Sequence, residues 1–345
     1  MPAVPNADPR PVVAITMGDP AGIGPEVVAR AFAARGAAAG ARRVVFGDAR
    51  VMKRAVAVTG AALTIRPIRS PREGHFGPSE LEVVDLANAD PAVFEAGRVS
   101  AVCGRASWEY VEAASRAALA GEVDAVVTAP INKESIAAAR LPYVGHTEML
   151  AAVTGVRDPL TMFQTGGLRV FFLTRHVSLR GACDLVTRPR IVACLERCSA
   201  ALAGLGVNGL IAVAGLNPHC GEHGLFGDEE GREIEPAVAA ARTKGLPVAG
   251  PIGADSVFHL ARTGRYAAVL SLYHDQGHIA CKTLDFERTI SLTLGLPFLR
   301  ASVDHGTAFD IAWMGKASGV SMSEAVTAAA RHAKAFRALH SDRSG

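Results

Sequence analysis

Short runs of β-branched residues alternate with alanine-rich stretches of helical character along most of this chain. Strands that alternate with helices are typical of an α/β fold with a largely parallel sheet, and we expect that fold here. The expected strands are Val12 to Thr16, Arg43 to Phe46, Asp124 to Thr128, Leu168 to Thr174, Leu210 to Ala214 and Ala267 to Leu272. The expected helices are Pro25 to Arg35, Ala101 to Ala120, Thr187 to Ala203, Glu229 to Ala241 and Met322 to Ala338.

The length of the chain predicts more than one domain. Its 345 residues exceed the usual size of a single hydrophobic core. We expect a flexible tail at residues 1–11, a first domain of residues 12–134 with 302–345, and a second of residues 135–301. Proline, arginine and glycine break the rhythm near residues 66–98, which predicts an insertion or an antiparallel excursion. Ser321-Met-Ser-Glu324 has capping-box spacing and predicts the start of the last helix.

Charge and cysteine content exclude several classes of protein. The 36 basic and 33 acidic residues nearly balance, and no basic block indicates a nucleic-acid partner. Charges interrupt the alanine-rich runs well short of the roughly 20 apolar residues that a membrane span needs. The six cysteines form no CxxC pair, and no secretory signal stands at the start. We therefore expect a cytoplasmic protein that binds neither nucleic acid nor membrane.

The span from Tyr273 to Trp313 concentrates polar groups beside apolar strands. It contains a His-Asp pair, Lys282, Arg300 and a glycine-containing loop. Such groups cost free energy to bury unless they are paired, so their density predicts a functional site.

Three histidines directly follow predicted strands: His176, His219 and His274. In open α/β sheets, ligands bind outside the carboxyl ends of the strands. Imidazoles from three strand ends are suited to hold one divalent cation and to leave coordination positions open for a substrate. The alternative for each histidine alone is a structural role in a loop or a helix cap.

Two of these histidines have a second histidine four residues later, the spacing of a helical metal site. Pro218, Gly221 and Gly277 indicate loops at both places, where this spacing has no geometric meaning. We expect His223 and His278 to be poorer ligands.

Two glycine-rich stretches differ in their context. Gly18 to Glu26 links the first strand to the first helix, and it is suited either to an anion at the helix N-terminus or to a plain tight turn. Gly204 to Gly209 spells GxGxxG, but it follows a helix and precedes a strand. We reject it as a nucleotide site.

Gly145-His-Thr-Glu148 predicts the start of another helix. There, His146 and Thr147 are suited to bind a phosphate or a carboxylate, although Thr147 alone is compatible with a simple N-cap. Lys282 and Arg300 would complete such an anion pocket.

With these residues assembled, the chain resembles the 4-hydroxythreonine-4-phosphate dehydrogenase family and its catabolic relatives. A loop like Gly18 to Glu26 and a cofactor loop like residues 305–312 make it similar, more distantly, to isocitrate and isopropylmalate dehydrogenases. The motifs that carry the family resemblance are Gly18 to Glu26, Gly145 to Glu148, Asn217 to Glu222, Gly250 to Asp255, Tyr273 to Gly277 and Asp304 to Ala312.

The resemblance implies an α/β/α subunit of two domains and a homodimer whose active site lies in an interdomain cleft and is completed by the partner. It implies NAD binding without a Rossmann fold, with NADP not excluded, and a divalent metal such as Zn, Mn, Co or Mg. The implied metal ligands are His176, His219 and His274. The implied substrate contacts are His146, Thr147, Lys282, Ser291 and Arg300, and the implied cofactor loop contains His305, Gly306, Thr307, Ala308 and Asp310.

The chain departs from the family at Ser291, where the family has an asparagine. The preceding stretch, Phe286 to Ser291, also adds the carboxylate of Glu287, which would repel a phosphate unless Arg288 neutralises it. Phe226 to Glu230 and Phe309 to Trp313 look more like the catabolic branch, whose members oxidise 4-phospho-threonate or 4-phospho-erythronate.

The shared reactive unit of these small anionic substrates predicts an oxidation followed by decarboxylation. A metal lowers the pKa of a secondary hydroxyl, hydride passes to NAD, and the β-keto acid loses carbon dioxide. Asp275, Asp255 and Lys282 are the catalytic candidates, the two aspartates either for proton transfer or for orienting a ligand imidazole. The alternatives are a terephthalate cis-dihydrodiol dehydrogenase of the same family, a metal-dependent hydrolase, and a paralogue that binds a metabolite without catalysis.

Overall fold

A computed structural model describes residues 8–34 and 40–341 of the chain. These residues pack into two units. The first runs to Asp158 and resumes at Leu296, and the second is Pro159–Gly295. We expected the domain boundaries at residues 134/135 and 301/302. The units instead divide at 158/159 and 295/296, so the first unit includes more of the middle of the chain. Residues 1–7 of the expected tail lie outside the described residues.

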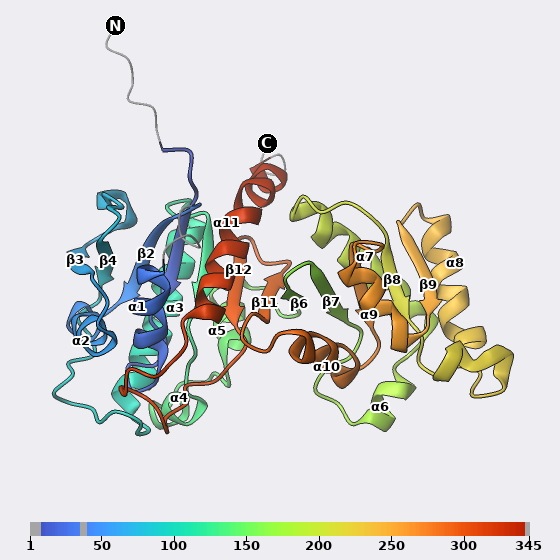
Figure 1. Cartoon of the computed structure of the whole chain (residues 1–345), viewed down its shortest axis with the longest axis horizontal. Coiled ribbons are helices and arrows are strands. Elements are labelled where there is room, and N and C mark those ends of the chain that lie inside the picture. The colour runs from blue at the N-terminus through green and yellow to red at the C-terminus, as the bar shows by residue number, and fades with distance from the viewer. Residues whose placement is uncertain (1–7, 35–39, 342–345) are drawn as a thin grey trace, which may run out of the picture. The chain divides into compact units, whose positions relative to one another are not determined.

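The first unit contains a parallel sheet with helices on both faces (Figure 1). Its central strand is entirely buried, as expected for parallel strands covered on both sides. The strand order is β3 (Thr64–Ile68), β4 (Glu80–Asp85), β2 (Arg42–Gly47), β1 (Val12–Thr16), β5 (Ala125–Thr128) and β12 (Leu299–Val303).

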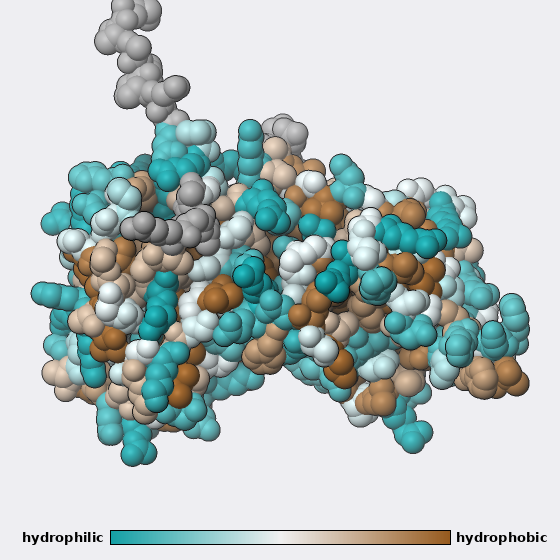
Figure 2. Space-filling model, viewed as in Figure 1, coloured by the Kyte–Doolittle hydropathy of each residue, from teal (hydrophilic) through white to brown (hydrophobic). Residues whose placement is uncertain are grey.

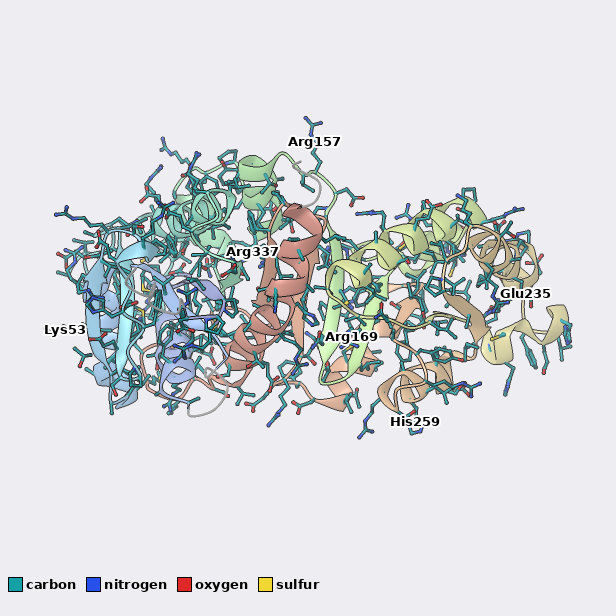
Figure 3. The ribbon with its side chains drawn as sticks, turned by 90° about the horizontal axis from the view of Figure 1, so that it is seen from above. Lys53, Arg157, Arg169, Glu235, His259 and Arg337 are labelled. Atoms are coloured by element: carbon teal, nitrogen blue, oxygen red, sulfur yellow. The ribbon has the colours of Figure 1, made fainter. Side chains whose placement is uncertain are left out.

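The helices of the first unit cover both faces of its sheet. On one face lie α1 (Gly24–Ala33), α2 (Ala49–Thr59) and α11 (Val320–Ser341); on the other lie α3 (Ala101–Leu119), α4 (Lys133–Ala138) and α5 (His146–Thr154) (Figure 1). Arg337 of α11, labelled in Figure 3, pairs with Asp124, whose other carboxylate oxygen accepts the Val12 N–H at 2.7 Å. Asp124 thus ties the last helix to the start of the first strand.

The second unit contains a mixed sheet. Its strand order is β11 (Ile290–Leu294), β6 (Leu160–Thr165), β7 (Leu168–Phe172), β10 (Ala268–Ser271), β8 (Ile211–Ala214) and β9 (Val248–Ile252). Only β6 runs antiparallel to its neighbours. The helices are α6 (Leu179–Asp184), α7 (Arg188–Gly204), α8 (Glu235–Thr243), α9 (Ala254–Arg262) and α10 (His274–Leu284). Residues of β7, β8 and β10 pack with α9 and α10 in a continuous apolar core.

The α/β class is confirmed, and two local predictions are wrong. Residues 64–85 form parallel strands on either side of the short helix η1 (Pro71–Glu73), rather than an antiparallel excursion. The capping box does not form, because α11 begins at Val320 and the buried Ser321 hydroxyl has no hydrogen-bond partner among the described residues. The helix expected from Glu229 to Ala241 is confirmed, and its first part is a π-helical turn, η3 (Glu230–Ile234), that leads into α8.

The described surface is mixed in character. On the face in Figure 2, hydrophobic residues are interspersed among hydrophilic ones. Among the described residues, no helix combines the length and the apolar character needed to cross a membrane.

Candidate functional site

The three histidines predicted to bind a metal follow neighbouring strands of the second unit. His176 follows β7, His274 begins α10 directly after β10, and His219 follows β8. These strands are parallel and adjacent in the order β7, β10, β8. Their carboxyl ends therefore lie along one edge of the sheet, where α/β proteins bind ligands.

His176 and His274 lie close together. Their ring centroids are 5.8 Å apart, a separation at which two imidazoles can bind one cation. His274 Nδ1 lies 2.6 Å from Asp275 Oδ1. A carboxylate at Nδ1 fixes the tautomer and leaves Nε2 for a ligand, so Asp275 occupies the orienting position that was one of its two expected roles.

The expectation of a loop at His274 and His278 is wrong. Both lie on α10, and their rings stack with centroids 3.6 Å apart and planes inclined by 12°. His278 Nδ1 lies 2.8 Å from the His274 carbonyl oxygen, and its ring also packs on Phe163 and Phe172. The i, i+4 spacing therefore has geometric meaning here, because His278 supports the His274 ring.

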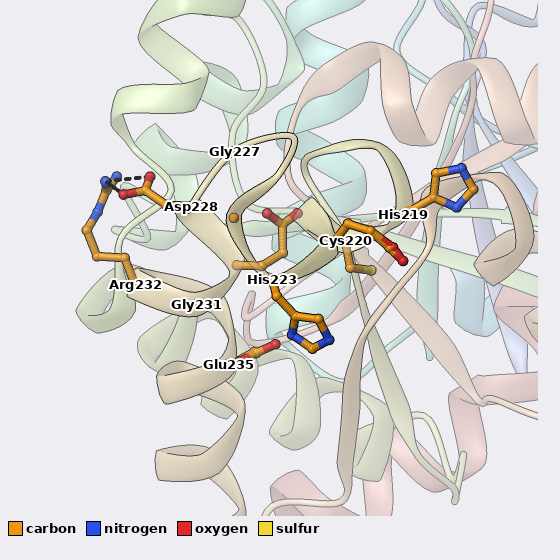
Figure 4. A pocket seen from close by; sticks show the side chains of 11 residues that line it. His219, Cys220, His223, Gly227, Asp228, Gly231, Arg232 and Glu235 are labelled. Atoms are coloured by element: carbon orange, nitrogen blue, oxygen red, sulfur yellow. Dashed lines mark hydrogen bonds and ion pairs between the residues drawn. The ribbon is translucent and has the colours of Figure 1, made fainter.

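His219 lies in a helical segment of the opposite hand, η2 (Pro218–Gly224). The five residues from His219 to His223 all have positive φ, between 46° and 77°. L-residues other than glycine adopt this conformation rarely, and seldom in succession. The segment lines a cavity of about 480 Å³, in which the rings of His219 and His223 point in different directions (Figure 4).

The three histidines fit a divalent cation in chemistry and in strand order. His176 and His274 also fit in spacing. Among the residues that the structure describes, however, no three His, Cys, Asp or Glu side chains are arranged to hold a metal ion.

The predicted anion site has a buried basic centre in the first unit. Arg300 lies in β12, and one of its terminal nitrogens donates to Thr128 Oγ1 at 2.5 Å. Burial lowers the pKa of Arg300 to about 10, so it stays cationic at neutral pH. Burial, and then the Arg300 charge, hold the pKa of His146 well below its usual range. His146, the first residue of α5, is therefore neutral.

The remaining predicted substrate and proton-transfer residues lie on several elements. Thr147 is the second residue of α5, after the N-cap Gly145, and is not itself the cap. Lys282 lies on α10, with its Nζ 5.3 Å from the centroid of the Phe286 ring. Ser291 lies in β11, opposite Phe163. Asp255 is exposed in the first turn of α9.

The turn from Gly18 to Glu26 binds protein groups through its own amides. Gly22 N–H donates to the Asp19 carbonyl at 3.0 Å, and Ala21 N–H donates to the Asp19 carboxylate at 2.8 Å. Ile23 N–H donates to the Thr307 carbonyl at 3.0 Å. These donors are not open to an anion, which favours the tight-turn interpretation.

The predicted cofactor segment, residues 305–312, is partly exposed to solvent. Gly306 is exposed, and apart from its chain neighbours no atom of the described residues lies within 4 Å of the point where a Cβ would stand. Asp310 is exposed as well, whereas Thr307 is buried against the Gly18 to Glu26 turn. An accessible stretch with an anchored backbone fits a ligand such as a nucleotide.

Two buried glutamates hold predicted site segments. Glu26 accepts hydrogen bonds from Trp313 and Gly315, and Glu230 accepts them from Leu216 and Asn217. Glu26 belongs to a motif that carries the family resemblance, and Glu230 belongs to the stretch that looks like the catabolic branch, but no role was predicted for either. The sequence signal that could have indicated these roles was the position of each carboxylate, Glu26 in a glycine-rich motif and Glu230 in an acidic one.

The chain is similar to known proteins over most of its length. The family model described as "Pyridoxal phosphate biosynthetic protein PdxA" matches residues 39–329. A protein of Symbiobacterium thermophilum, provisionally named D-threonate 4-phosphate dehydrogenase, is 56% identical over 331 residues, which are 96% of this chain and 99% of that protein.

Solved structures agree. The 4-hydroxythreonine-4-phosphate dehydrogenase of Klebsiella pneumoniae has a TM-score of 0.86 at 44% identity, covering 94% of this chain and 99% of that one. A terephthalate 1,2-cis-dihydrodiol dehydrogenase of Burkholderia xenovorans has a TM-score of 0.63 at 32% identity, covering 93% and 98%. The family predicted from the motifs is thus confirmed, and the chain belongs to the PdxA family.

Proposed function

We propose that this chain is an NAD- and divalent-metal-dependent dehydrogenase. Its substrate would be a phosphorylated 3-hydroxy acid of the 4-phospho-threonate type, oxidised at the secondary alcohol and then decarboxylated. The observation that carries the proposal is the set of three histidines at the carboxyl ends of adjacent strands, in a family whose relatives are named dehydrogenases.

The histidines would hold the cation. When bound, a divalent metal supplies Lewis acidity for the charge on the substrate hydroxyl and on the product of decarboxylation. Asp275 orients His274 so that Nε2 faces a ligand. His176 and His219 complete the set.

The anionic groups of the substrate would bind to residues of different hydrogen-bonding character. Arg300 supplies a charged planar fork, because its lowered pKa still leaves it protonated at neutral pH. His146 is neutral and can both donate and accept. Lys282, Thr147 and Ser291 would complete the contacts.

The cofactor would lie along His305, Gly306, Thr307, Ala308 and Asp310. NAD supplies the hydride acceptor when bound, and NADP is not excluded. The hydroxyl proton would leave through Asp275, Asp255 or Lys282, which remain the proton-transfer candidates.

We further propose a cytoplasmic homodimer with an interdomain active site completed by the partner. The described residues of one chain do not bring three ligands together. A donor set that is incomplete in one chain supports completion by a second copy.

The test is NAD reduction with 4-phospho-threonate, 4-phospho-erythronate, 4-phosphohydroxythreonine and the terephthalate dihydrodiol, each with Zn, Mn, Co or Mg. We expect turnover with a phosphorylated hydroxy acid that is lost with chelator and regained with metal. Full activity in chelator would contradict the metal role. Activity only with the dihydrodiol would move the chain to that branch.

A hydrolase or a non-catalytic paralogue makes a different prediction. A hydrolase has no reason to bind NAD, and a paralogue without catalysis would bind the substrate and leave it unchanged. Nucleotide titration together with product analysis therefore separates these alternatives from the proposed dehydrogenase.

A further inference from the structure

We infer that Glu26 is a positioning residue for nucleotide binding. It would act by holding the segment from Thr307 to Gly315 in one conformation. The inference rests on the proposed function, which assigns residues 305–312 to the cofactor. Glu26 itself touches neither substrate nor cofactor in this proposal.

The Glu26 carboxylate is fully buried and binds the segment with both oxygens. Oε2 accepts the Trp313 N–H at 2.6 Å, and Oε1 accepts the Gly315 N–H at 2.7 Å. A buried carboxylate is costly unless it accepts hydrogen bonds, and bonds to a charged acceptor are among the strongest in proteins. This pair therefore fixes the C-terminal end of the segment to the first turn of α1.

The rest of the turn holds the segment at further points. Ile23 N–H donates to the Thr307 carbonyl at 3.0 Å, and Trp313 Nε1–H donates to the Pro20 carbonyl at 3.0 Å. Gly22 lies directly against Thr307, where a Cβ would come within 2.9 Å of the Thr307 Cβ. The turn and the segment thus fit together without space for a larger residue at Gly22.

The segment has a backbone that needs such support. Ala308 and Trp313 have φ values of 39° and 63°, which residues other than glycine rarely adopt. Conformations of this kind persist only where surrounding contacts impose them. Since the strained Trp313 donates its own N–H to Glu26, loss of the carboxylate would release that residue first.

The test compares Glu26→Gln and Glu26→Ala with Glu134→Gln, an exposed glutamate of α4 in the same unit. A glutamine oxygen can accept one N–H, but its amide group opposes the second. We expect Glu26→Gln to raise the Kd for NADH at least about tenfold and the KM for NAD in parallel, with kcat changed much less. The Glu134→Gln control should match the wild type.

A second measurement reads the contact directly. Hydrogen exchange should accelerate in peptides covering residues 307–316 in Glu26→Gln, but not in the control. Trp313→Phe keeps the backbone bonds to Glu26 and loses the indole bond to the Pro20 carbonyl, so it should raise the NADH Kd by a few-fold. It tests the anchoring of the segment by the turn, independently of Glu26.

The outcomes separate this inference from the proposed function. A wild-type protein that binds no NADH contradicts the proposed function, while the exchange experiment still tests whether Glu26 holds the segment. A folded Glu26→Gln protein with wild-type NADH affinity and wild-type exchange would overturn the inference. Where neither Glu26 variant folds, hydrogen exchange of the wild type tests the inference, and Trp313 and Gly315 amides that exchange as fast as those of exposed loops would overturn it.

Discussion

Asp19 shows how the first unit accommodates a buried charge. Its side chain is fully buried between the first strand and α1, and burial raises its pKa to about 6. The hydrogen bond from Ala21 N–H acts in the opposite direction but does not offset burial. The native state therefore retains the Asp19 proton to a higher pH than the unfolded chain does.

Asp19→Asn should remove a pH dependence of stability. Between the unfolded pKa of 3.8 and the folded value of about 6, the native state binds more protons than the unfolded state. The stability contribution of Asp19 is thus complete below pH 3.8 and falls as the pH rises through 6, by about 3 kcal/mol in all. Asparagine cannot ionise, so the variant should gain stability relative to the wild type over this range.

Urea unfolding of both proteins at several pH values from 4.5 to 7.5 measures this difference. The expected result is a free-energy difference that shifts in favour of Asp19→Asn as the pH rises. A difference that stays constant with pH would show that Asp19 does not carry the dependence.

The left-handed segment η2 is the most strained element among the described residues. Four of its residues other than glycine have positive φ, and each such residue costs about 1–2 kcal/mol. Glu230 opposes this strain. Its Oε1 accepts the N–H groups of Leu216 and Asn217, both at 2.7 Å, and its Oε2 accepts the Asn217 side-chain amide at 2.8 Å. Glu230 lies in a π-helical turn, a feature frequent at functional sites.

Glu230→Gln should therefore destabilise this segment more than Glu229→Gln. The two residues are neighbours and lose the same charge, but Glu230 is buried and binds the backbone before η2, whereas Glu229 is only partly buried and accepts the Asn217 side-chain amide. We expect a loss of about 2–3 kcal/mol for Glu230→Gln and less than about 1 kcal/mol for Glu229→Gln. Hydrogen exchange of residues 216–226 together with denaturant unfolding measures both. Equal effects in the two variants would mean that Glu230 has no special part in holding η2.

Local signals predicted most elements, and tertiary contacts explain the exceptions. The β-branched run at Val12–Thr16 and the long helix after Ser100 formed as expected, because pattern and capping agree there. Gly277 was misleading. It suggested a loop, yet it lies within α10. Glycine is required there because a Cβ would come within 2.5 Å of the Phe172 ring. A glycine required by packing cannot be distinguished in sequence from one that ends a helix.

Only part of the candidate site could be predicted from the sequence. Histidines after strands could be found because strand ends follow from pattern. The conformation around His219 could not, since four residues other than glycine adopt positive φ in succession there. The backbone just before them is bound by Glu230, which tertiary structure brings into place. The same applies to Glu26, whose partners lie more than 280 residues later in the chain.

Each unit of the chain contains part of the predicted catalytic set. The first holds His146, Arg300 and the segment around Thr307, and the second holds the three histidines and Lys282. In the described part of one chain, the rings of His176 and His274 approach each other, but no three His, Cys, Asp or Glu side chains are arranged to hold a metal ion. A homodimer that shares its sites would remove this shortfall, because the missing ligand would come from the other copy.

A hybrid dimer tests this sharing. His176→Ala and His219→Ala chains carrying different tags would be co-expressed, and the dimer that holds both tags isolated. If His176 and His219 of one site come from different chains, one of the two sites contains both alterations and the other contains neither. The hybrid should then show about half of the wild-type activity and bind about one metal ion per dimer, whereas each variant alone should show neither.

The opposite arrangement gives a distinct result. Where both histidines of a site come from one chain, every site of the hybrid carries one alteration, and activity and metal binding stay as low as in the single variants. Metal content read beside NAD reduction distinguishes a lost ligand from a lost catalytic step. A wild-type chain that sediments as a monomer while fully active would exclude shared sites altogether, and His219 would then have to reach His176 and His274 within its own chain.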